Sequence, residues 1–238
     1  MWLIVNAGSS SLKLKVIDGK REVAKAFVGE IGPDGHGTAM REGLAQAGVP
    51  LHRLTAAAHR VVHGGASLTA TCRVTPEVLR QIEACVPLAP LHNPGNLVGI
   101  QAVEELAPHL PQYAAFDTAF HATNPEVATT YALPQSARDL GLRRYGFHGI
   151  SFAALVRILR QRGQLPGRLL ACHLGNGCSL AAIVNGRSVA TTMGYSPLDG
   201  LTMGTRSGGI DGNAVLRLAD LHGTEGAARI LNRESGLL

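Results

Sequence analysis

Two stretches far apart in the chain share one pattern of apolar and polar residues. Each has a short apolar run, a turn of small polar residues and a second run that is apolar or alternating: residues 3–5, 6–11 and 12–16 in the first copy, and 169–172, 173–179 and 180–184 in the second. Short apolar runs and period-two alternation both indicate strands. Asp18-Gly19 and Asn185-Gly186 follow them as hairpin signals.

Helical periodicity fills the intervals between these strands. Apolar residues three and four apart predict helices that contain residues 78–82, 96–106 and 152–159. Thr75-Pro76 indicates the start of the first helix, and Ser151 is expected to cap the third. Residues 112–116 form an expected strand that ends at Asp117. Strands alternating with helices predict an α/β fold.

The spacing of the two copies indicates a duplicated unit. Gly8 and Gly175 lie 167 residues apart, as do Gly19 and Gly186. We expect each copy to begin one domain. The boundary should fall between Phe120 and Gly146, which gives a first domain of residues 1–145 and a second of residues 146–238.

Composition narrows the class of partner. The net charge is +5, but the basic residues are dispersed and aromatic residues make up only 4% of the chain, so a stacking surface for nucleic acid is not expected. No apolar run is long enough to span a bilayer, and the apolar N-terminus indicates a strand and not a signal peptide. Four scattered cysteines fit reduced thiols. A cytoplasmic protein that binds a small anion is the expectation.

The two polar turns are candidate phosphate sites. Backbone N–H groups in short Gly, Ser and Asn runs form concavities that bind anions. A pair of ordinary hairpins is the alternative interpretation. The chain has no G-x-x-x-x-G-K-[ST] sequence, so it is not a P-loop enzyme.

Glycine-flanked charged residues add candidates for chemistry. Arg60 precedes Gly64-Gly65, and Arg206 precedes Gly208-Gly209. Arginine matches carboxylate and phosphate oxygens, although pairing with a structural carboxylate is equally common. Asp117 at a strand end could hold Mg²⁺ or could simply cap a turn. His148 stands between glycines and could donate to developing negative charge. Together these residues describe phosphoryl transfer to an anionic acceptor.

Six segments in order resemble the acetate kinase family: N-A-G-S-S-S-L-K from Asn6, H-R-V-V-H-G-G from His59, F-D-T-A-F-H from Phe116, Y-G-F-H-G from Tyr145, H-L-G-N-G from His173 and M-G-T-R-S-G from Met203. The resemblance implies duplicated actin-like, ribonuclease H-like domains with mixed sheets flanked by helices, the active site in the cleft between domains. It also implies that ATP and acetate give ADP and acetyl phosphate by direct in-line transfer with Mg²⁺.

The resemblance assigns roles to positions of this sequence. It implies catalytic roles for Arg60, Asp117, His148 and Arg206. It also implies that Arg60 binds the substrate and that Asn6 and Asp117 bind magnesium. An acetate-methyl pocket would comprise Val62, Leu91, Phe147 and Pro197. Phosphate and nucleotide contacts are implied for the two polar turns: Asn6, Ser9, Ser11, Lys13, His173, Gly175, Asn176 and Gly177.

The sequence departs from the family pattern in two places. Phe152 stands where the family usually has histidine. Family chains also run beyond Leu238 and carry an adenosine-binding G-I-G-E-N-like motif that this sequence lacks, so the second domain is expected to be incomplete. A binding module without ATP turnover, and a kinase for propionate or butyrate, are therefore alternatives. Exposed apolar surface predicts a homodimer or higher self-association.

Overall fold

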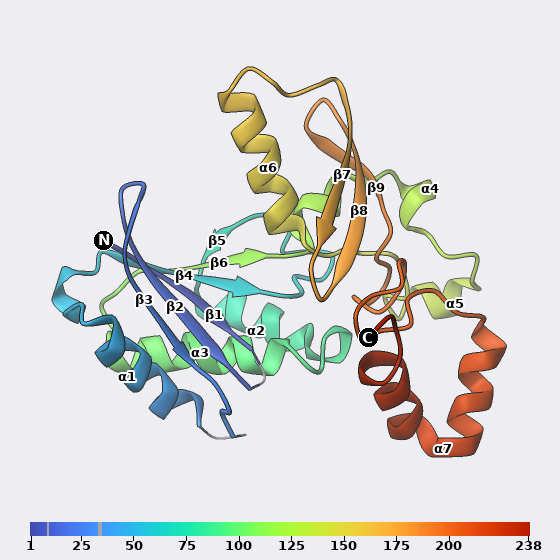
Figure 1. Ribbon diagram of the computed structural model, residues 1–238, viewed down its shortest axis with the longest axis horizontal. Coiled ribbons are helices and arrows are strands. Elements are labelled where there is room, and N and C mark those ends of the chain that lie inside the picture. The colour runs from blue at the N-terminus through green and yellow to red at the C-terminus, as the bar shows by residue number, and fades with distance from the viewer. Residues whose placement is uncertain (9, 33–34) are drawn as a thin grey trace. The chain divides into compact units, whose positions relative to one another are not determined.

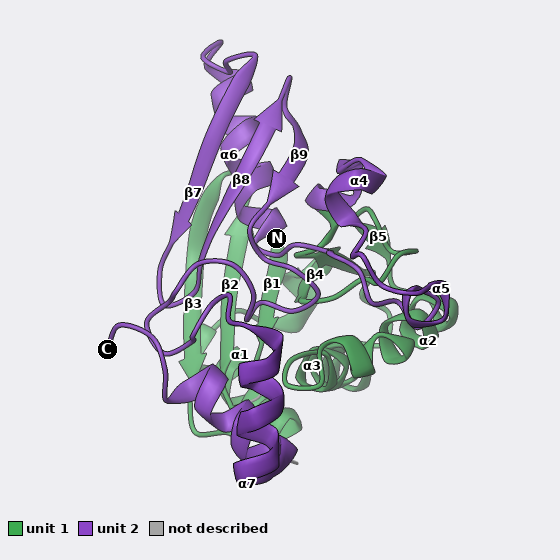
Figure 2. Ribbon diagram, turned by 90° about the vertical axis from the view of Figure 1, so that its right-hand side faces the viewer, with its two compact units in different colours: residues 1–119 green, residues 120–238 purple. Residues whose placement is uncertain are grey.

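The chain folds into two compact units. The computed structural model describes residues 1–8, 10–32 and 35–238. The units are Met1–Ala119 and Phe120–Leu238, coloured green and purple in Figure 2. This division lies earlier than the predicted one after residue 145. The physical reason is that residues 120–145 bond within unit 2, where the His121 ring meets the Ser188 hydroxyl at 2.8 Å and Thr123 donates to the Ser188 carbonyl at 2.7 Å.

Unit 1 is built on a mixed sheet of six strands in the order β3-β2-β1-β4-β6-β5 (Figure 1). β1 pairs antiparallel with β2 and parallel with β4, and β4 pairs parallel with β6. The carboxyl ends of β1, β4 and β6 therefore meet at one edge of the sheet. The strands are β1 (Trp2–Ala7), β2 (Leu12–Asp18), β3 (Arg21–Val28), β4 (Ala56–Val61), β5 (Cys72–Arg73) and β6 (Gln112–Phe116).

Two helices cover one face of that sheet. α1 and α3 pack against each other and against the first strands, as Figure 1 shows. Alternate residues of β1 and β2 form the core beneath them, with Leu3, Val5 and Leu14 each only 1% exposed. The remaining elements complete the unit: α1 (His36–Ala47), α2 (Pro76–Ala84), α3 (Asn93–Leu106) and the short helices η1 (Leu51–Arg53) and η2 (Val86–Leu88).

Unit 2 contains a three-stranded sheet, β7-β8-β9, with α6 on one face. Phe152 and Val156 of α6 pack onto Ala171, Ala181 and Ile183 of the sheet. The long helix α7 is interrupted at Gly223, whose φ of 71° is not helical. The elements are η3 (Ala119–Thr123), α4 (Glu126–Thr129), α5 (Gln135–Arg138), α6 (Gly149–Gln161), β7 (Arg168–Leu174), β8 (Cys178–Val184), β9 (Arg187–Thr191) and α7 (Gly212–Arg233).

The predicted elements are largely confirmed. Hairpins form at Asp18-Gly19, between β2 and β3, and at Asn185-Gly186, between β8 and β9. The strand at 112–116 forms, and the Thr75 hydroxyl caps α2 by accepting from the Val78 amide at 3.2 Å. The predicted cap at Ser151 is wrong, because α6 begins at Gly149 after His148 adopts a left-handed conformation. The helix expected from Asn96 begins three residues earlier, at Asn93.

The sheets and helices confirm the predicted α/β class, with mixed pairing in unit 1. In the part of the chain that the structure describes, no helix is both long and apolar enough to cross a bilayer.

Candidate active site

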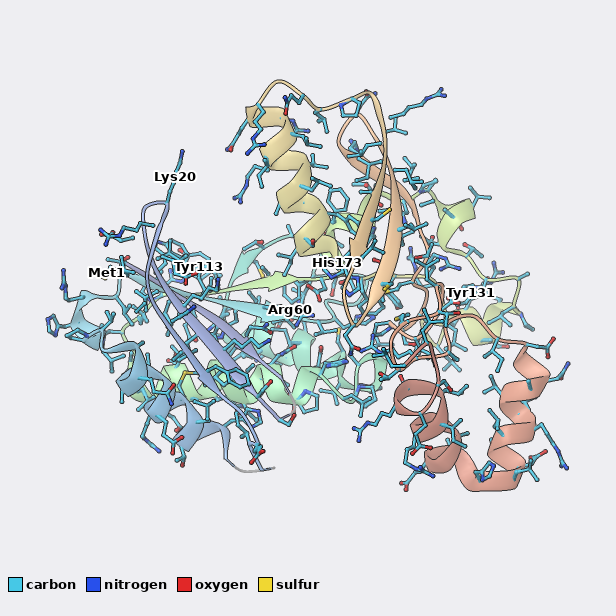
Figure 3. The ribbon with its side chains drawn as sticks, in the orientation of Figure 1. Met1, Lys20, Arg60, Tyr113, Tyr131 and His173 are labelled. Atoms are coloured by element: carbon cyan, nitrogen blue, oxygen red, sulfur yellow. The ribbon has the colours of Figure 1, made fainter. Side chains whose placement is uncertain are left out.

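The strand ends of unit 1 bring three predicted residues together. Asn6 lies at the end of β1, Arg60 near the end of β4 and Asp117 directly after β6 (Figure 3 labels Arg60). The Arg60 Nη2 donates to Asp117 Oδ2 at 2.6 Å, and its Nε donates to the two carboxylate oxygens at 3.1 and 3.3 Å. Its Nη1 donates to Asn6 Oδ1 at 3.1 Å. One guanidinium thus joins the ends of three adjacent parallel strands.

Burial explains why this cluster needs its arginine. The Asp117 side chain is 4% exposed, whereas the Arg60 side chain is 40% exposed. A buried carboxylate is stable only with charge compensation and hydrogen bonds, and the planar fork of arginine supplies both. The Arg60 side chain nevertheless remains partly accessible to an anionic ligand.

Two buried asparagines of α3 fix the backbone around this cluster. Asn96 donates to the Ala7 carbonyl at 2.6 Å and accepts from the Val62 amide at 2.9 Å, so it ties the end of β1 to the residues after β4. Asn93 bonds both the amide and the carbonyl of His63, at 3.1 and 3.0 Å. Each asparagine is at most 2% exposed. They position the backbone beside Arg60.

The first polar turn is held from inside unit 1. Gly8 donates its amide to the Ser11 carbonyl at 2.7 Å, and the carbonyl of Gly8 lies 2.8 Å from Nε2 of the buried His36, which must donate. Lys13 is the cross-strand neighbour of Asn6, and its ammonium lies 5.8 Å from the ring centroid of Phe27. The predicted phosphate contact at Ser9 lies outside the described residues.

The unit 2 candidates gather around His148. This residue precedes α6 with a φ of 61°, and its Nδ1 lies 2.8 Å from the Ser179 hydroxyl. Its ring stacks on His173, with centroids 3.9 Å apart and planes inclined by 21°. His173, labelled in Figure 3, lies on β7 with its Nδ1 3.0 Å from the Ser151 hydroxyl. Ser151 therefore bonds a site histidine where a helix cap was expected.

The Arg206 side chain lies close to His148, beside Gly177. A Cβ atom on Gly177 would lie 3.3 Å from Arg206 Nη1 and 3.3 Å from His148 Nε2, so both nitrogens lie on the same side of that glycine. Arg206 Nη1 also donates to the Pro197 carbonyl at 3.3 Å. Burial lowers the pKa of Arg206 from its very high ordinary value. Glycine at position 177 therefore keeps a side chain from crowding these two nitrogens.

The second polar turn borders this point. Gly175 donates to the Gly177 carbonyl at 3.1 Å, and Gly204 donates to the Asn176 carbonyl at 3.3 Å. The turn is therefore tied to the loop that carries Arg206.

A buried histidine supports the backbone before His148. His121 donates from Nε2 to the Phe147 carbonyl at 2.9 Å, and burial lowers its pKa to about 4. Gly146 has a φ of 78°, and a Cβ there would lie 2.5 Å from Thr191 and 2.8 Å from His121. Only glycine fits this approach. Phe152, which replaces the expected histidine, is 1% exposed and meets the rings of His121 and His173 edge-on.

The four residues predicted to surround a methyl group differ in burial. Val62 is 4% and Phe147 1% exposed, Pro197 is half-buried and Leu91 is 50% exposed. Val62 and Leu91 belong to unit 1, and Phe147 and Pro197 belong to unit 2. Their role remains a prediction.

The donor types in unit 1 fit magnesium. Asp117 offers a carboxylate and Asn6 an amide oxygen, and Mg²⁺ is commonly held by one or two protein oxygens together with water and substrate phosphates. Both oxygens of Asp117 accept from Arg60, the weaker contact being Oδ1 at 3.3 Å. Among the described residues no group of three His, Cys, Asp or Glu could hold a metal alone. A ligand phosphate would have to complete the shell.

Several supporting residues were not predicted from the sequence. These are His36, Asn93, Asn96, His121, Ser151 and Ser179, which bond the site residues or the backbone beside them. Asn93 and Asn96 carried a usable signal, since two asparagines stand in the first turn of a helix whose next four residues, 97–100, are apolar or glycine. The partners of the others are set by the folded chain.

Comparisons with known proteins agree with the motifs. The acetokinase family model matches residues 38–238. An acetate kinase of Rhodopseudomonas palustris is 42% identical over 273 aligned positions, covering 99% of this chain and 68% of that protein. One from Synechococcus sp. is 52% identical over 183 positions, covering 75% of this chain and 45% of its own length. The chain thus spans about half to two thirds of the curated relatives it matches.

Solved structures give the same result. The acetate kinase of Porphyromonas gingivalis superposes with a TM-score of 0.88 at 35% identity, and the propionate kinase of Francisella tularensis with 0.88 at 33%. In each case 99% of this chain and 68% of the solved chain are covered. This chain belongs to the acetokinase family.

Proposed function

We propose that this chain carries out the acetate kinase reaction, in which ATP and acetate give ADP and acetyl phosphate. The observation that carries the proposal is that Arg206 Nη1 and His148 Nε2 lie on the same side of Gly177, each 3.3 Å from where a Cβ of residue 177 would be. Two donors held on the same side of a glycine turn can stabilise charge on the oxygens of a phosphoryl group in transfer. The family relatives named acetate kinase support the assignment.

The transfer needs no proton abstraction by the protein. An oxygen of the acetate carboxylate forms a bond to the γ-phosphorus, the bond to the oxygen bridging the β- and γ-phosphates breaks, and ADP leaves with that electron pair. The protein has to align the two anions and neutralise their charge. Arg60 and Arg206 supply the neutralising charge in this proposal.

His148 would act as a hydrogen-bond donor. A neutral imidazole that donates from Nε2 must accept at Nδ1, and the Ser179 hydroxyl lies 2.8 Å from that atom. Ser179 is fully buried, so it holds the ring and its tautomer. Asn6 and Asp117 would hold Mg²⁺, which would neutralise phosphate charge when bound.

Propionate is a second candidate substrate. The structural match to a propionate kinase is as good as that to an acetate kinase, with a TM-score of 0.88 for both. One methylene in an apolar pocket changes specificity by roughly 10- to 200-fold. Comparing kcat/KM for the two acids decides between them.

Self-association is proposed for the chain when it is purified alone. Large apolar side chains are exposed on several elements, including Leu170 at 66% and Leu216 at 64%. Such surfaces favour association. A clean monomer by light scattering at micromolar concentration would contradict this.

The test of the function is acetyl phosphate formation from ATP, acetate and Mg²⁺, trapped with hydroxylamine. Arg206→Ala should lower kcat by at least about 100-fold, the size expected for one lost charge-stabilising donor. Arg217→Ala, an exposed arginine on α7, is the matched control and should retain activity. Equal activity in the Arg206 variant and the control would overturn the proposed role.

A further inference from the structure

Unit 2 contains a pocket whose described lining residues include none of the candidate active-site residues. Its volume is about 460 Å³, and ligand pockets commonly measure roughly 300–1,000 Å³. The wall comes from α4, from α5 and from the segments beside them, within residues 124–143 (Figure 1 labels both helices). Among the described residues that line it, Leu142 alone is apolar. The pocket is therefore suited to a polar ligand.

One wall of this pocket holds a buried amide with nothing to bond. Asn124 is 8% exposed, and in the described part of the chain neither its side-chain oxygen nor its side-chain nitrogen has a hydrogen-bond partner. An unpaired buried amide costs free energy, so each case calls for an explanation. The χ2 torsion of asparagine is soft, so a small rotation can turn the amide toward a ligand. Asn124 thus has both a donor and an acceptor to offer.

Two arginines give the pocket its charge. Arg138 and Arg143 are exposed, and among the residues that the structure describes neither forms a salt bridge. Arg138 Nη2 donates to Gln135 Oε1 at 2.8 Å, and the guanidinium carbon of Arg143 lies 5.7 Å from the ring centroid of Tyr145. These contacts orient the two guanidinium groups without neutralising them. Glu126 is the one carboxylate in the described lining, so positive charge dominates there.

We infer that this pocket binds a small organic anion that carries a carboxylate or phosphate group together with a hydroxyl or amide group. Carboxylate and phosphate oxygens share the geometry that a planar guanidinium recognises, so either anion would accept hydrogen bonds from Arg138 and Arg143. The neutral polar group would pair with Asn124. The inference does not depend on the proposed function, because the described lining contains no residue assigned to phosphoryl transfer.

Water alone is the competing occupant. A polar cavity of this size has room for several water molecules, and one of them could pair with the Asn124 amide. The two accounts differ in what the arginines do. An anion site needs the charge of Arg138, whereas a water-filled pocket does not.

The experiment measures binding to this chain by isothermal titration calorimetry with three probes. Glycerol 3-phosphate supplies a phosphate and hydroxyls, malate supplies carboxylates and a hydroxyl, and glycerol supplies hydroxyls alone. At least one of the two anions should bind with a Kd below about 1 mM, and glycerol should not bind. Which anion binds more tightly distinguishes a phosphate site from a carboxylate site.

Three arginine variants locate the binding. Arg138→Gln should weaken it at least about tenfold, because it removes a charge-assisted hydrogen bond. Arg217→Gln is the matched control, an exposed arginine on α7 outside the described lining, and should bind normally. Arg206→Ala should also bind normally, because that residue belongs to the candidate active site.

Asn124→Leu gives the sharper result, since leucine is close to asparagine in size and needs no hydrogen bonds. Removing an unpaired buried amide should leave the thermal midpoint of the free chain unchanged or higher. The same change should weaken anion binding at least about fivefold. Stability kept while binding is lost is the pattern expected of a residue retained for a ligand.

Circular dichroism of each variant separates loss of binding from loss of fold. The inference is overturned if neither anion binds, or if Arg138→Gln binds as tightly as the Arg217 control. Binding that Arg206→Ala abolishes and Arg138→Gln leaves intact would place the anion at the candidate active site and would also overturn it. A lower midpoint for Asn124→Leu with unchanged binding would assign the amide to the fold and not to a ligand.

Discussion

The hairpins β1-β2 and β7-β8 have the same local design and opposite environments. Both begin with a short apolar strand and turn through small polar residues, and both carry a predicted site residue near the end of the first strand, Asn6 in one and His173 in the other. Yet Leu3 is 1% exposed and its counterpart Leu170 is 66% exposed. The difference teaches that the strand pattern determines the hairpin, while burial depends on what packs over it afterwards.

The largest expected difference follows from cavity formation. Leu3→Ala should lower the free energy of unfolding by about 2–5 kcal/mol, because a buried leucine leaves a cavity when truncated. Leu170→Ala should change it by less than about 0.5 kcal/mol, as surface substitutions do. Urea denaturation of both variants gives the two values. Equal losses would break the comparison, since they would show that Leu170 is already buried.

Buried and exposed asparagines should differ in the same way. Asn96→Ala in unit 1 removes bonds to the Ala7 carbonyl and the Val62 amide, and should lower the free energy of unfolding by about 2–4 kcal/mol because two buried backbone groups lose their partner. Asn232→Ala in unit 2 removes one exposed bond to the Ala228 carbonyl and should cost less than about 0.5 kcal/mol. Chemical denaturation measures both, and a small loss for Asn96 would argue against its role in fixing β1.

Buried histidines should make both units sensitive to mild acid. Burial lowers the pKa of His59 in unit 1 and of His121 in unit 2 to about 4, against an ordinary value of 6.5. As pH falls from 6.5 to 4, the unfolded chain binds protons that the folded chain does not, so stability decreases across that window and levels off below it.

The expected loss is about 1–2 kcal/mol per histidine between pH 7 and pH 5. Urea denaturation at the two pH values measures it. His121→Gln removes one titrating group, so that variant should show a smaller dependence. A variant with the same pH dependence as the parent chain would show that His121 does not titrate in this way.

The smallest expected changes in stability come from the helix caps. Thr75 caps α2 in unit 1, and Asp211 caps α7 in unit 2 by accepting from the Asn213 and Ala214 amides at 2.8 and 3.4 Å. Replacing either by alanine should cost about 1 kcal/mol. Thermal denaturation of the two variants should show similar small shifts, so this pair sharpens the comparison by showing where the units are alike. A much larger loss at one cap would mean that its side chain does more than cap the helix.

Hairpins and helices could be predicted from short sequence patterns, whereas contacts between residues far apart in the chain could not. The hairpins and the helix capped by Thr75 follow from patterns of a few residues, which is why they were correct. Ser151 failed as a cap because the left-handed His148 starts α6 earlier and the serine hydroxyl meets His173, which is 22 residues away. Sequence periodicity carries no information on such a contact.

Prediction from sequence has the same limit at the candidate site. Arg60, Asp117, His148 and Arg206 were singled out by their motifs, and the structure describes Arg60 with Asp117 in one cluster and His148 with Arg206 in the other. Asn96 was predicted only as part of a helix, because its bond to Ala7 spans 89 residues. The residues predicted to act on ligands were chosen from motifs, whereas the residues that hold them in place depend on the fold.

Amide hydrogen exchange of this chain alone tests most directly whether one hairpin is covered and its duplicate is open. The amides of β1 bond on both sides, to β2 and β4, and lie over the α1 and α3 core, so they should exchange slowly. The amides of β7 bond to β8 alone among the described residues, so alternate amides should exchange at close to the unprotected rate. Protection of every β7 amide at the level of β1 would contradict the comparison.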